Sequence, residues 1–271
     1  MEAAEKKEIG RQPADEMSFL DHLEALRWHI IRSLGAISVI AVLVFFAKDL
    51  VFRQIILSPT RADFVTYKFL CSLGEQLCIY PEGATVYTRQ LGEQFVIHLK
   101  VSFWLGLIVA FPYVFYEFWK FIAPGLYDKE RKAAKGVVFI CSSLFLLGVA
   151  FGYFIISPFA VTFLSGYSVS AEVANTFTLS SLVDYMTMFT LPTGLIFQLP
   201  VVMYFLGKVG IVTASFLRQY RKHAIVIMLI AGALITPPDV ITQILIALPL
   251  YILYEVSIFV VAKIEKKQAE E

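Results

Sequence analysis

The chain has 271 residues, of which 58% are hydrophobic and 17% charged, with a net charge of +1. Apolar residues make up about 45–50% of an ordinary soluble domain, and here the excess falls into long uninterrupted runs, which indicates a membrane protein. The net charge gives no sign of a nucleic-acid partner and we expect none, so the main surroundings of the chain should be the lipid bilayer.

The N-terminal part divides into a polar tail, residues 1–17, and a charged stretch that leads into the first apolar run. That run is too long for a cleavable signal peptide and lacks a small-residue cleavage site, so it should remain as a span. Ser18 followed by Asp21 predicts a capped helix start, and a short amphipathic helix should then run along the membrane surface into the span.

The sequence HLEALRW at 22–28 lies on this amphipathic helix and allows two interpretations. In the first, Trp28 is an interfacial anchor, the Arg27 side chain reaches out to water, and Glu24 is simply solvated. In the second, the Glu24 carboxylate is held at the mouth of the membrane to bind a cationic ligand.

Runs of about 20 apolar residues predict six transmembrane helices, near residues 29–47, 95–118, 136–157, 181–205, 222–236 and 240–262. The expected fold is therefore an all-α, polytopic membrane protein. The fifth run is short, because fifteen helical residues at ~1.5 Å each cover roughly 22 Å of a ~30 Å hydrocarbon core. The two prolines of TPPD at 236–239 cannot continue a helix, so a tight turn should separate the last two spans.

The distribution of Lys and Arg predicts the orientation. The segments 158–180 and 237–239 contain neither residue. Most of them gather in residues 1–32, 120–135, 208–222 and 263–267. By the positive-inside rule both termini should face the cytoplasm. The chain then consists of a cytoplasmic tail, a six-span domain with a long first outside loop, and a second cytoplasmic tail, with boundaries at 1–17, 18–262 (the loop at about 48–94) and 263–271.

Two of the three cysteines, Cys71 and Cys78, lie in the first outside loop, which would face an oxidising compartment. There they either form a disulfide or remain as free thiols, and their spacing does not decide between the two. Cys141 lies inside an apolar run and should pack as a small hydrophobic residue. Three scattered cysteines do not make a metal site, so neither a metal nor a cofactor is expected.

A second charged stretch, FIAPGLYDKERK at 121–132, follows the second span. Pro124 and Gly125 break the helix there, and two acidic residues lie among basic ones. These acids can be incidental to a positive-inside loop. Alternatively, Glu130 and Glu24 lie on the same cytoplasmic side and together face a basic ligand.

The stretches HLEALR at 22–27, FIAPGLYDKERK at 121–132 and LITPPDVITQ at 234–243, together with the six-span layout, resemble the TatC family. TatC is the receptor subunit of the twin-arginine protein translocase. The likeness covers roughly residues 17–262, and FIAPxLYxxER combined with TPPD is specific to the family.

The resemblance implies a subunit of a Sec-independent translocase that binds signal peptides with adjacent arginines. With single-span partners similar to TatA and TatB, such proteins move folded proteins across the bacterial cytoplasmic (inner) membrane using the proton-motive force. The resemblance also implies a homo-oligomer within a hetero-oligomeric complex. Carried over to this chain, the implied signal-peptide-binding residues are Glu130, Glu24, Leu26, Arg27 and Phe121.

This chain departs from the family motif at one of these positions. Where HLxELR has its glutamate, residue 25 is alanine, and Glu24 comes one residue earlier. One residue turns a helix by about 100°. Either the flexible Glu24 side chain takes over the role, or the role is left to Glu130.

Polar residues inside the spans are few. Gln198 stands in FQLP of the fourth span, where the family often has Glu. It should either contact a partner helix or hydrogen-bond a carbonyl that Pro200 leaves free in the same protein. Glu117 and Glu255 lie near cytoplasmic span ends, where reaching to the interface would account for their charge.

Enzymes and small-molecule transporters fit the sequence less well. It contains no HExxH and no nucleotide-binding glycine loop, and its four histidines are scattered, so catalysis is not expected. An ion-coupled transporter needs ionisable groups at mid-membrane, where the spans offer mainly Gln198. Six helices of ~10–12 Å diameter cannot encircle a folded domain about 30 Å across, so partner chains would have to complete any passage for folded cargo.

Overall fold

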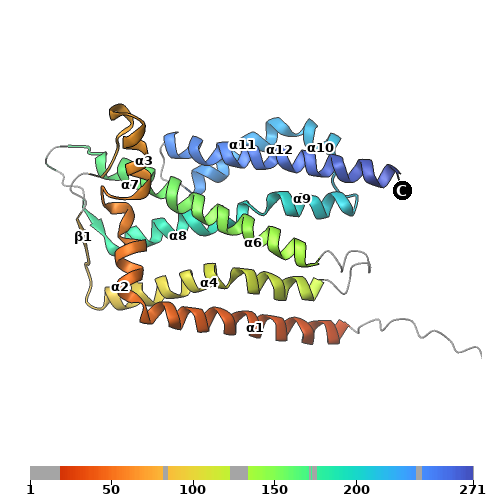
Figure 1. The fold of residues 1–271 in the computed structure, drawn as a ribbon, viewed down its shortest axis with the longest axis horizontal. Coiled ribbons are helices and arrows are strands. Elements are labelled where there is room, and N and C mark those ends of the chain that lie inside the picture. Colours follow the sequence, from red (N-terminus) through yellow and green to blue (C-terminus); the bar gives the residue numbers. More distant parts are fainter. Residues whose placement is uncertain are drawn as a thin grey trace, which may run out of the picture.

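The computed structural model describes residues 19–81, 85–122, 134–170, 172, 176–235 and 240–270. They form a bundle of long helices that carries a cap of short elements at one end (Figure 1). The bundle helices are α1 (Phe19–Phe46), α4 (Glu93–Ile122), α6 (Ala134–Phe151), α7 (Ser157–Gly166), α8 (Leu179–Ile196), α9 (Leu199–Lys208), α10 (Ala214–Gln219), α11 (Arg221–Ile235) and α12 (Val240–Glu270).

The cap is built mainly from the segment between α1 and α4. Its elements are α2 (Lys48–Leu50), the π-helical turn η1 (Val51–Ile56), the 3-10 turns η2 (Ser58–Thr60) and η3 (Glu75–Leu77), and α3 (Val65–Leu73). Strand β1 (Val86–Tyr87) pairs in parallel with β2 (Phe177–Thr178). The all-α fold class is confirmed apart from this two-residue pairing, and the expected outside loop is in part helical.

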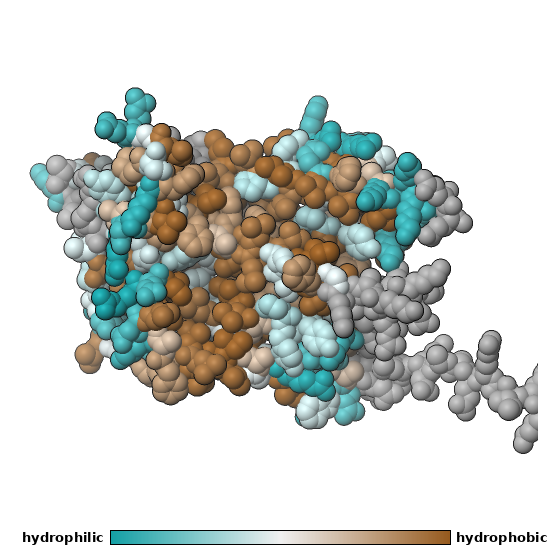
Figure 2. Space-filling view, in the orientation of Figure 1, coloured by the Kyte–Doolittle hydropathy of each residue, from teal (hydrophilic) through white to brown (hydrophobic). Residues whose placement is uncertain are grey.

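Five helical stretches of the described chain are long and apolar enough to span a membrane: Leu23–Phe46, Glu93–Ile122, Gly136–Gly166, Leu179–Lys208 and Thr242–Gln268. The fifth expected span is α11, which has 15 residues and packs along α12. Hydrophobic side chains form a broad band across the face seen in Figure 2, between hydrophilic residues at the two ends. The protein is therefore a multi-pass membrane protein, and over its described residues α11 is the one expected span that is shorter than the length needed to cross a bilayer.

The first span begins earlier than expected. Residues 19–28 do not form a separate helix along the membrane surface, because α1 runs as one unbroken helix of 28 residues (Figure 1). No glycine or proline interrupts the helix before Gly35, so nothing turns the chain at the membrane boundary. The predicted start at Ser18 and the TPPD turn at 236–239 lie outside the described residues.

Prolines divide the third and fourth spans. The fourth is split into α8 and α9 at Phe197 and Gln198, because Pro200 has no N–H to donate and its ring crowds the preceding turn. The third continues beyond the expected end at 157. It passes through the π-helical turn η5 (Gly152–Ile156) just before Pro158 and then into α7.

The path from α6 into η5 crosses α8 with the two backbones almost in contact. A Cβ atom on Gly148 would lie 2.8 Å from the Cα of Gly194. A Cβ atom on Gly152 would clash with the carbonyl oxygen of Phe189 and lie 2.9 Å from the Cα of Thr190. Small residues four positions apart are the usual means by which membrane helices approach this closely.

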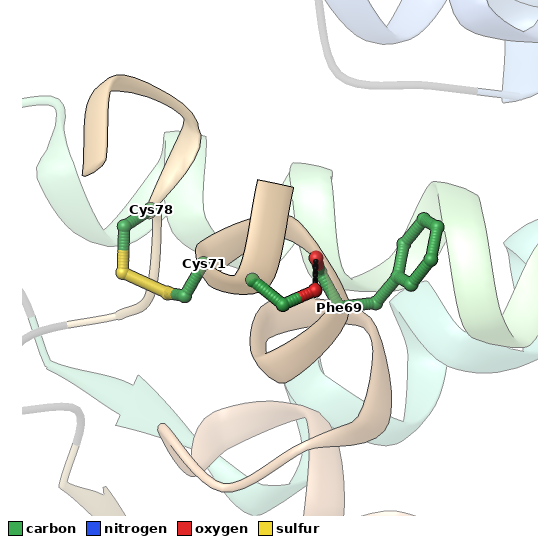
Figure 3. Close-up of a disulfide and its surroundings, with 4 residues drawn as sticks. Phe69, Cys71 and Cys78 are labelled. Carbon is green, nitrogen blue, oxygen red and sulfur yellow. Dashed lines mark hydrogen bonds between the residues drawn. A yellow bond between two sulfur atoms is a disulfide. The ribbon is translucent and has the colours of Figure 1, made fainter. Parts of the chain in front are cut away.

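A buried tyrosine is one of the side chains that fasten the cap to the bundle, together with Tyr153, whose hydroxyl donates to the Ile55 carbonyl oxygen of η1 over 2.8 Å. The hydroxyl of Tyr67 on α3 lies 2.9 Å from the Pro59 carbonyl oxygen and 3.1 Å from that of Pro158, which connects α3 to η2 and α7. Burial raises the pKa of Tyr67 to about 12, so the hydroxyl keeps the proton that it donates. Cys71 and Cys78, for which the sequence left two alternatives, are joined in a disulfide that ties α3 to the residue after η3 (Figure 3).

We predict that Gly152→Ala destabilises the bundle, because the added methyl group meets backbone atoms that cannot move independently. The expected loss is about 1–3 kcal/mol, as for an overpacked core, measured as a lower thermal unfolding midpoint in detergent. Gly136→Ala is the matched control, since a Cβ atom added to Gly136 on α6 would meet nothing within 4 Å beyond its own stretch of helix. An unchanged midpoint for the Gly152 variant would show that α6 and α8 separate at little cost.

Candidate functional site

The start of α1 and the end of α4 lie side by side at the end of the bundle opposite the cap (Figure 1). We call this region, residues 23–33 and 113–122, the α1–α4 rim. It contains four of the six residues that the sequence singled out: Glu24, Leu26 and Arg27 on α1, and Phe121 on α4. The C-terminal end of α12 reaches the same end of the molecule.

Glu117 is the most deeply buried charged residue described in the α1–α4 rim, with 2% of its surface exposed. Its Oε2 atom lies 2.6 Å from Nδ1 of His29 and 3.5 Å from the Arg32 guanidinium, and Oε1 lies 3.9 Å from Nζ of Lys120. A buried carboxylate without such partners would be strongly disfavoured. Three basic side chains, two of them on α1, therefore compensate a charge on α4.

This arrangement corrects the interpretation of Glu117 from sequence. The carboxylate does not reach out to the membrane interface but turns inward to α1. The role of His29 was also missed. A usable signal was present, because an acidic residue inside a long apolar helix requires a basic partner. The sequence alone does not show that α1 is the neighbour of α4, so it does not identify the basic partner of Glu117.

Glu24 and Ala25 occupy different faces of α1. Ala25 is half-buried and lies one turn before His29, on the side that meets α4. Glu24 is exposed and lies one turn before the exposed Trp28. The carboxylate that this chain does have is thus turned away from the position at which the family motif places its own, and it has no hydrogen-bond or ionic partner among the described residues.

The other predicted residues differ in how far they are integrated into the rim. Arg27 is exposed and Leu26 half-buried. The Phe121 ring packs edge-on against the His29 imidazole at a centroid distance of 6.1 Å, so it belongs to the same assembly as Glu117. Glu130 lies outside the described residues. Its segment connects α4, which ends at Ile122, to α6, which begins at Ala134.

Gln198 is not part of the rim but sits in the break between α8 and α9. Its Nε2 donates to the carbonyl oxygen of Cys141 on α6 over 3.0 Å, so its partner is a neighbouring helix and not a carbonyl freed by Pro200. The Oε1 atom of the same amide is buried and accepts no hydrogen bond from the described part of the chain. Gln198 therefore keeps one unused acceptor inside the membrane region.

Two further ion pairs among the described residues join neighbouring helices. Lys100 on α4 contacts Asp184 on α8, and Arg221 on α11 lies 2.7 Å from Glu255 on α12. Glu255 is thus held by Arg221 and by the Tyr251 hydroxyl, and its side chain is 32% accessible, as a residue that reaches to the interface should be. Within the described residues no group of three metal-binding side chains comes together.

Comparison with known proteins gives a consistent result. The family model for the Sec-independent protein translocase protein TatC matches residues 21–249. The TatC protein of Blattabacterium sp. subsp. Periplaneta americana (strain BPLAN) is 37% identical over 261 residues, covering 94% of this chain and 98% of its own. TatCy of Bacillus subtilis (strain 168) is 32% identical, covering 92% and 91% of the two chains.

The fold agrees as well. A crystal structure of the twin-arginine translocase receptor TatC superposes with a TM-score of 0.68 at 34% identity, and covers 89% of this chain and 97% of that one. The sequence relatives, the family model and the solved structure all extend over most of the bundle. The chain belongs to the TatC family of Sec-independent protein translocase proteins.

Proposed function

We propose that this subunit of the twin-arginine translocase binds twin-arginine signal peptides at the α1–α4 rim and the adjoining segment that holds Glu130. The observation that carries the proposal is the match to TatC proteins over nearly the full length of both chains. Membership of this family identifies the chain as a transport protein and not an enzyme. It also decides against the small-molecule transporter that the sequence left as an alternative.

The chemistry of the rim supports arginine recognition. A guanidinium presents a planar fork that pairs with both oxygens of a carboxylate, whereas an ammonium group is a point charge. Glu24 is exposed and has no described partner, so it is available to such a fork. An exposed pair contributes only about 0–1 kcal/mol, and a hydrogen bond to a charged group that is partly shielded about 1.5–3 kcal/mol. Leu26 and Phe121 offer adjoining apolar surface to the rest of the peptide.

Transport of a folded protein requires further chains. The described helices pack into two hydrophobic clusters that fill the bundle and leave no room for a folded domain. We propose that single-span partners similar to TatA and TatB, with further copies of this chain, complete the passage and that the proton-motive force drives it. Gln198 is the proposed contact for a polar group on a partner helix, and because its Oε1 atom is buried in this chain, that contact requires the break between α8 and α9 to open.

The proposed orientation has the rim in the bacterial cytoplasm and the cap outside. The positive-inside distribution supports it, and so does the Cys71–Cys78 disulfide in the cap, because disulfides persist on the oxidising side of a bacterial cytoplasmic membrane. Both observations favour N and C termini in the cytoplasm.

We predict that Glu130→Lys abolishes export of twin-arginine substrates, because it replaces an arginine-binding carboxylate by a like charge. Signal-peptide affinity should fall by at least about tenfold, corresponding to the loss of one charged hydrogen bond. Fractionation of a reporter with a twin-arginine signal measures export, and Asp63→Lys, at an exposed position in the cap, is the matched control. Normal export by the Glu130 variant would remove Glu130 from the site.

The Glu24 proposal is tested by moving the carboxylate by one position. We expect Glu24→Ala to weaken signal-peptide binding by roughly fivefold, as for an exposed ion pair of about 1 kcal/mol, and Glu24→Ala combined with Ala25→Glu to restore it. Site-specific cross-linking from residue 24 to the peptide should report the same contact. Full binding by Glu24→Ala would assign the arginine pair to Glu130 alone.

The orientation predicts the labelling pattern of the cysteines. In spheroplasts, a membrane-impermeant maleimide should label Cys71 and Cys78 only after an impermeant reductant has opened the disulfide. Cys141 is buried in α6 and should stay unlabelled. If labelling of Cys71 and Cys78 required lysis of the spheroplasts, the cap would have to lie in the cytoplasm.

A further inference from the structure

The described part of the α1–α4 rim is poor in negative charge for a surface that receives a cationic peptide. Glu24 and Glu117 are its acidic residues, against Arg27, Arg32 and Lys120. Only Glu24 of the two acids is exposed. Arg32 and Lys120 keep 50% and 45% of their side chains accessible, so their charges act on whatever approaches the rim.

Glu117 cannot itself bind a signal peptide. Its side chain is 3% accessible and both carboxylate oxygens already face basic groups, His29 and Arg32 on one side and Lys120 on the other. Its negative charge nevertheless lies within 4 Å of two side chains whose charges are at the surface. At such distances a buried carboxylate cancels most of the positive electrostatic potential that the neighbouring cation produces at the protein surface.

We propose that Glu117 is a positioning residue that balances the charge of the rim, and that twin-arginine peptides bind there because it offsets Arg32 and Lys120. This inference rests on the proposed function. The carboxylate pairs the two basic side chains and holds α1 against α4 through His29. Without it, the described rim would present three formal positive charges against the single carboxylate of Glu24 and would repel a peptide that carries two adjacent arginines.

A simpler explanation is that Glu117 only fastens α1 to α4. Glu117→Gln separates the two roles, because the amide oxygen can still accept from His29 while the charge is lost. Glu117→Gln combined with Lys120→Gln restores the original net charge without restoring the carboxylate. Lys120 also lies 4.4 Å over the Tyr116 ring, so Lys120→Gln alone serves as the matched control for lost packing.

The experiment measures binding of a fluorescent twin-arginine signal peptide to the full chain in uncharged detergent micelles, with a twin-lysine peptide as comparison. The salt concentration is raised from ~0.01 M to ~1 M, which shortens the screening length from about 30 Å to about 3 Å. We expect Glu117→Gln to weaken binding roughly fivefold to tenfold at low salt, and by less than about twofold at high salt. The double variant should bind as the unmodified chain does, and Lys120→Gln alone should bind more tightly at low salt.

Each outcome decides between the two roles. Unchanged binding by Glu117→Gln, or weakened binding that neither salt nor the second substitution corrects, overturns charge balancing. If Glu117→Gln fails to fold, as judged by its unfolding midpoint, charge balancing is tested by removing the positive charges instead, in Lys120→Gln and Arg32→Gln. Both must then tighten low-salt binding for the inference to stand. Failure of the unmodified chain to prefer the twin-arginine peptide would instead contradict the proposed function itself.

Discussion

The close crossing of α6 and α8 joins the two hydrophobic clusters of the bundle. Lipid offers helices little hydrophobic reason to associate, so their contact depends on how near the backbones can come. Gly148 and Gly152 meet α8 where any side chain would prevent the approach, and Gly148 does so directly at Gly194. Phe189 and Met186, one turn apart on α8, belong to the two different hydrophobic clusters, so this crossing is also where the clusters join.

Three ion pairs connect helices that pack against each other. Glu117 joins α4 to α1, Asp184 joins α8 to α4, and Glu255 joins α12 to α11. An unpaired acidic side chain in an apolar helix destabilises the fold, and a basic side chain on a neighbouring helix offsets that cost. The positions of these pairs therefore constrain which helices can be neighbours, and the pair between α1 and α4 does so next to the proposed binding site.

The sequence predicted correctly the features that depend on a single stretch of the chain. Long apolar runs located the helices, and TatC motifs located the family. It failed, or left alternatives open, where the outcome depends on how two elements lie relative to each other. The partner of Glu117 depends on α1 lying beside α4, and the partner of Gln198 on α6 lying beside the break before Pro200. The bond between Cys71 and Cys78 depends on the turn after α3, which spacing alone does not determine. The unbroken start of α1 differs from the prediction for another reason: an amphipathic pattern alone does not turn a helix, and no helix-breaking residue lies between Phe19 and Gly35.

The disulfide of the cap also has a consequence for biogenesis. Cys71 and Cys78 follow α1 in the chain and precede α4. In the proposed orientation, with the cap outside, the two thiols meet an oxidant only after α1 has inserted and the segment that follows it has crossed the membrane. A newly made chain that carries the bond has therefore completed this first insertion step, whether or not its later helices have already assembled.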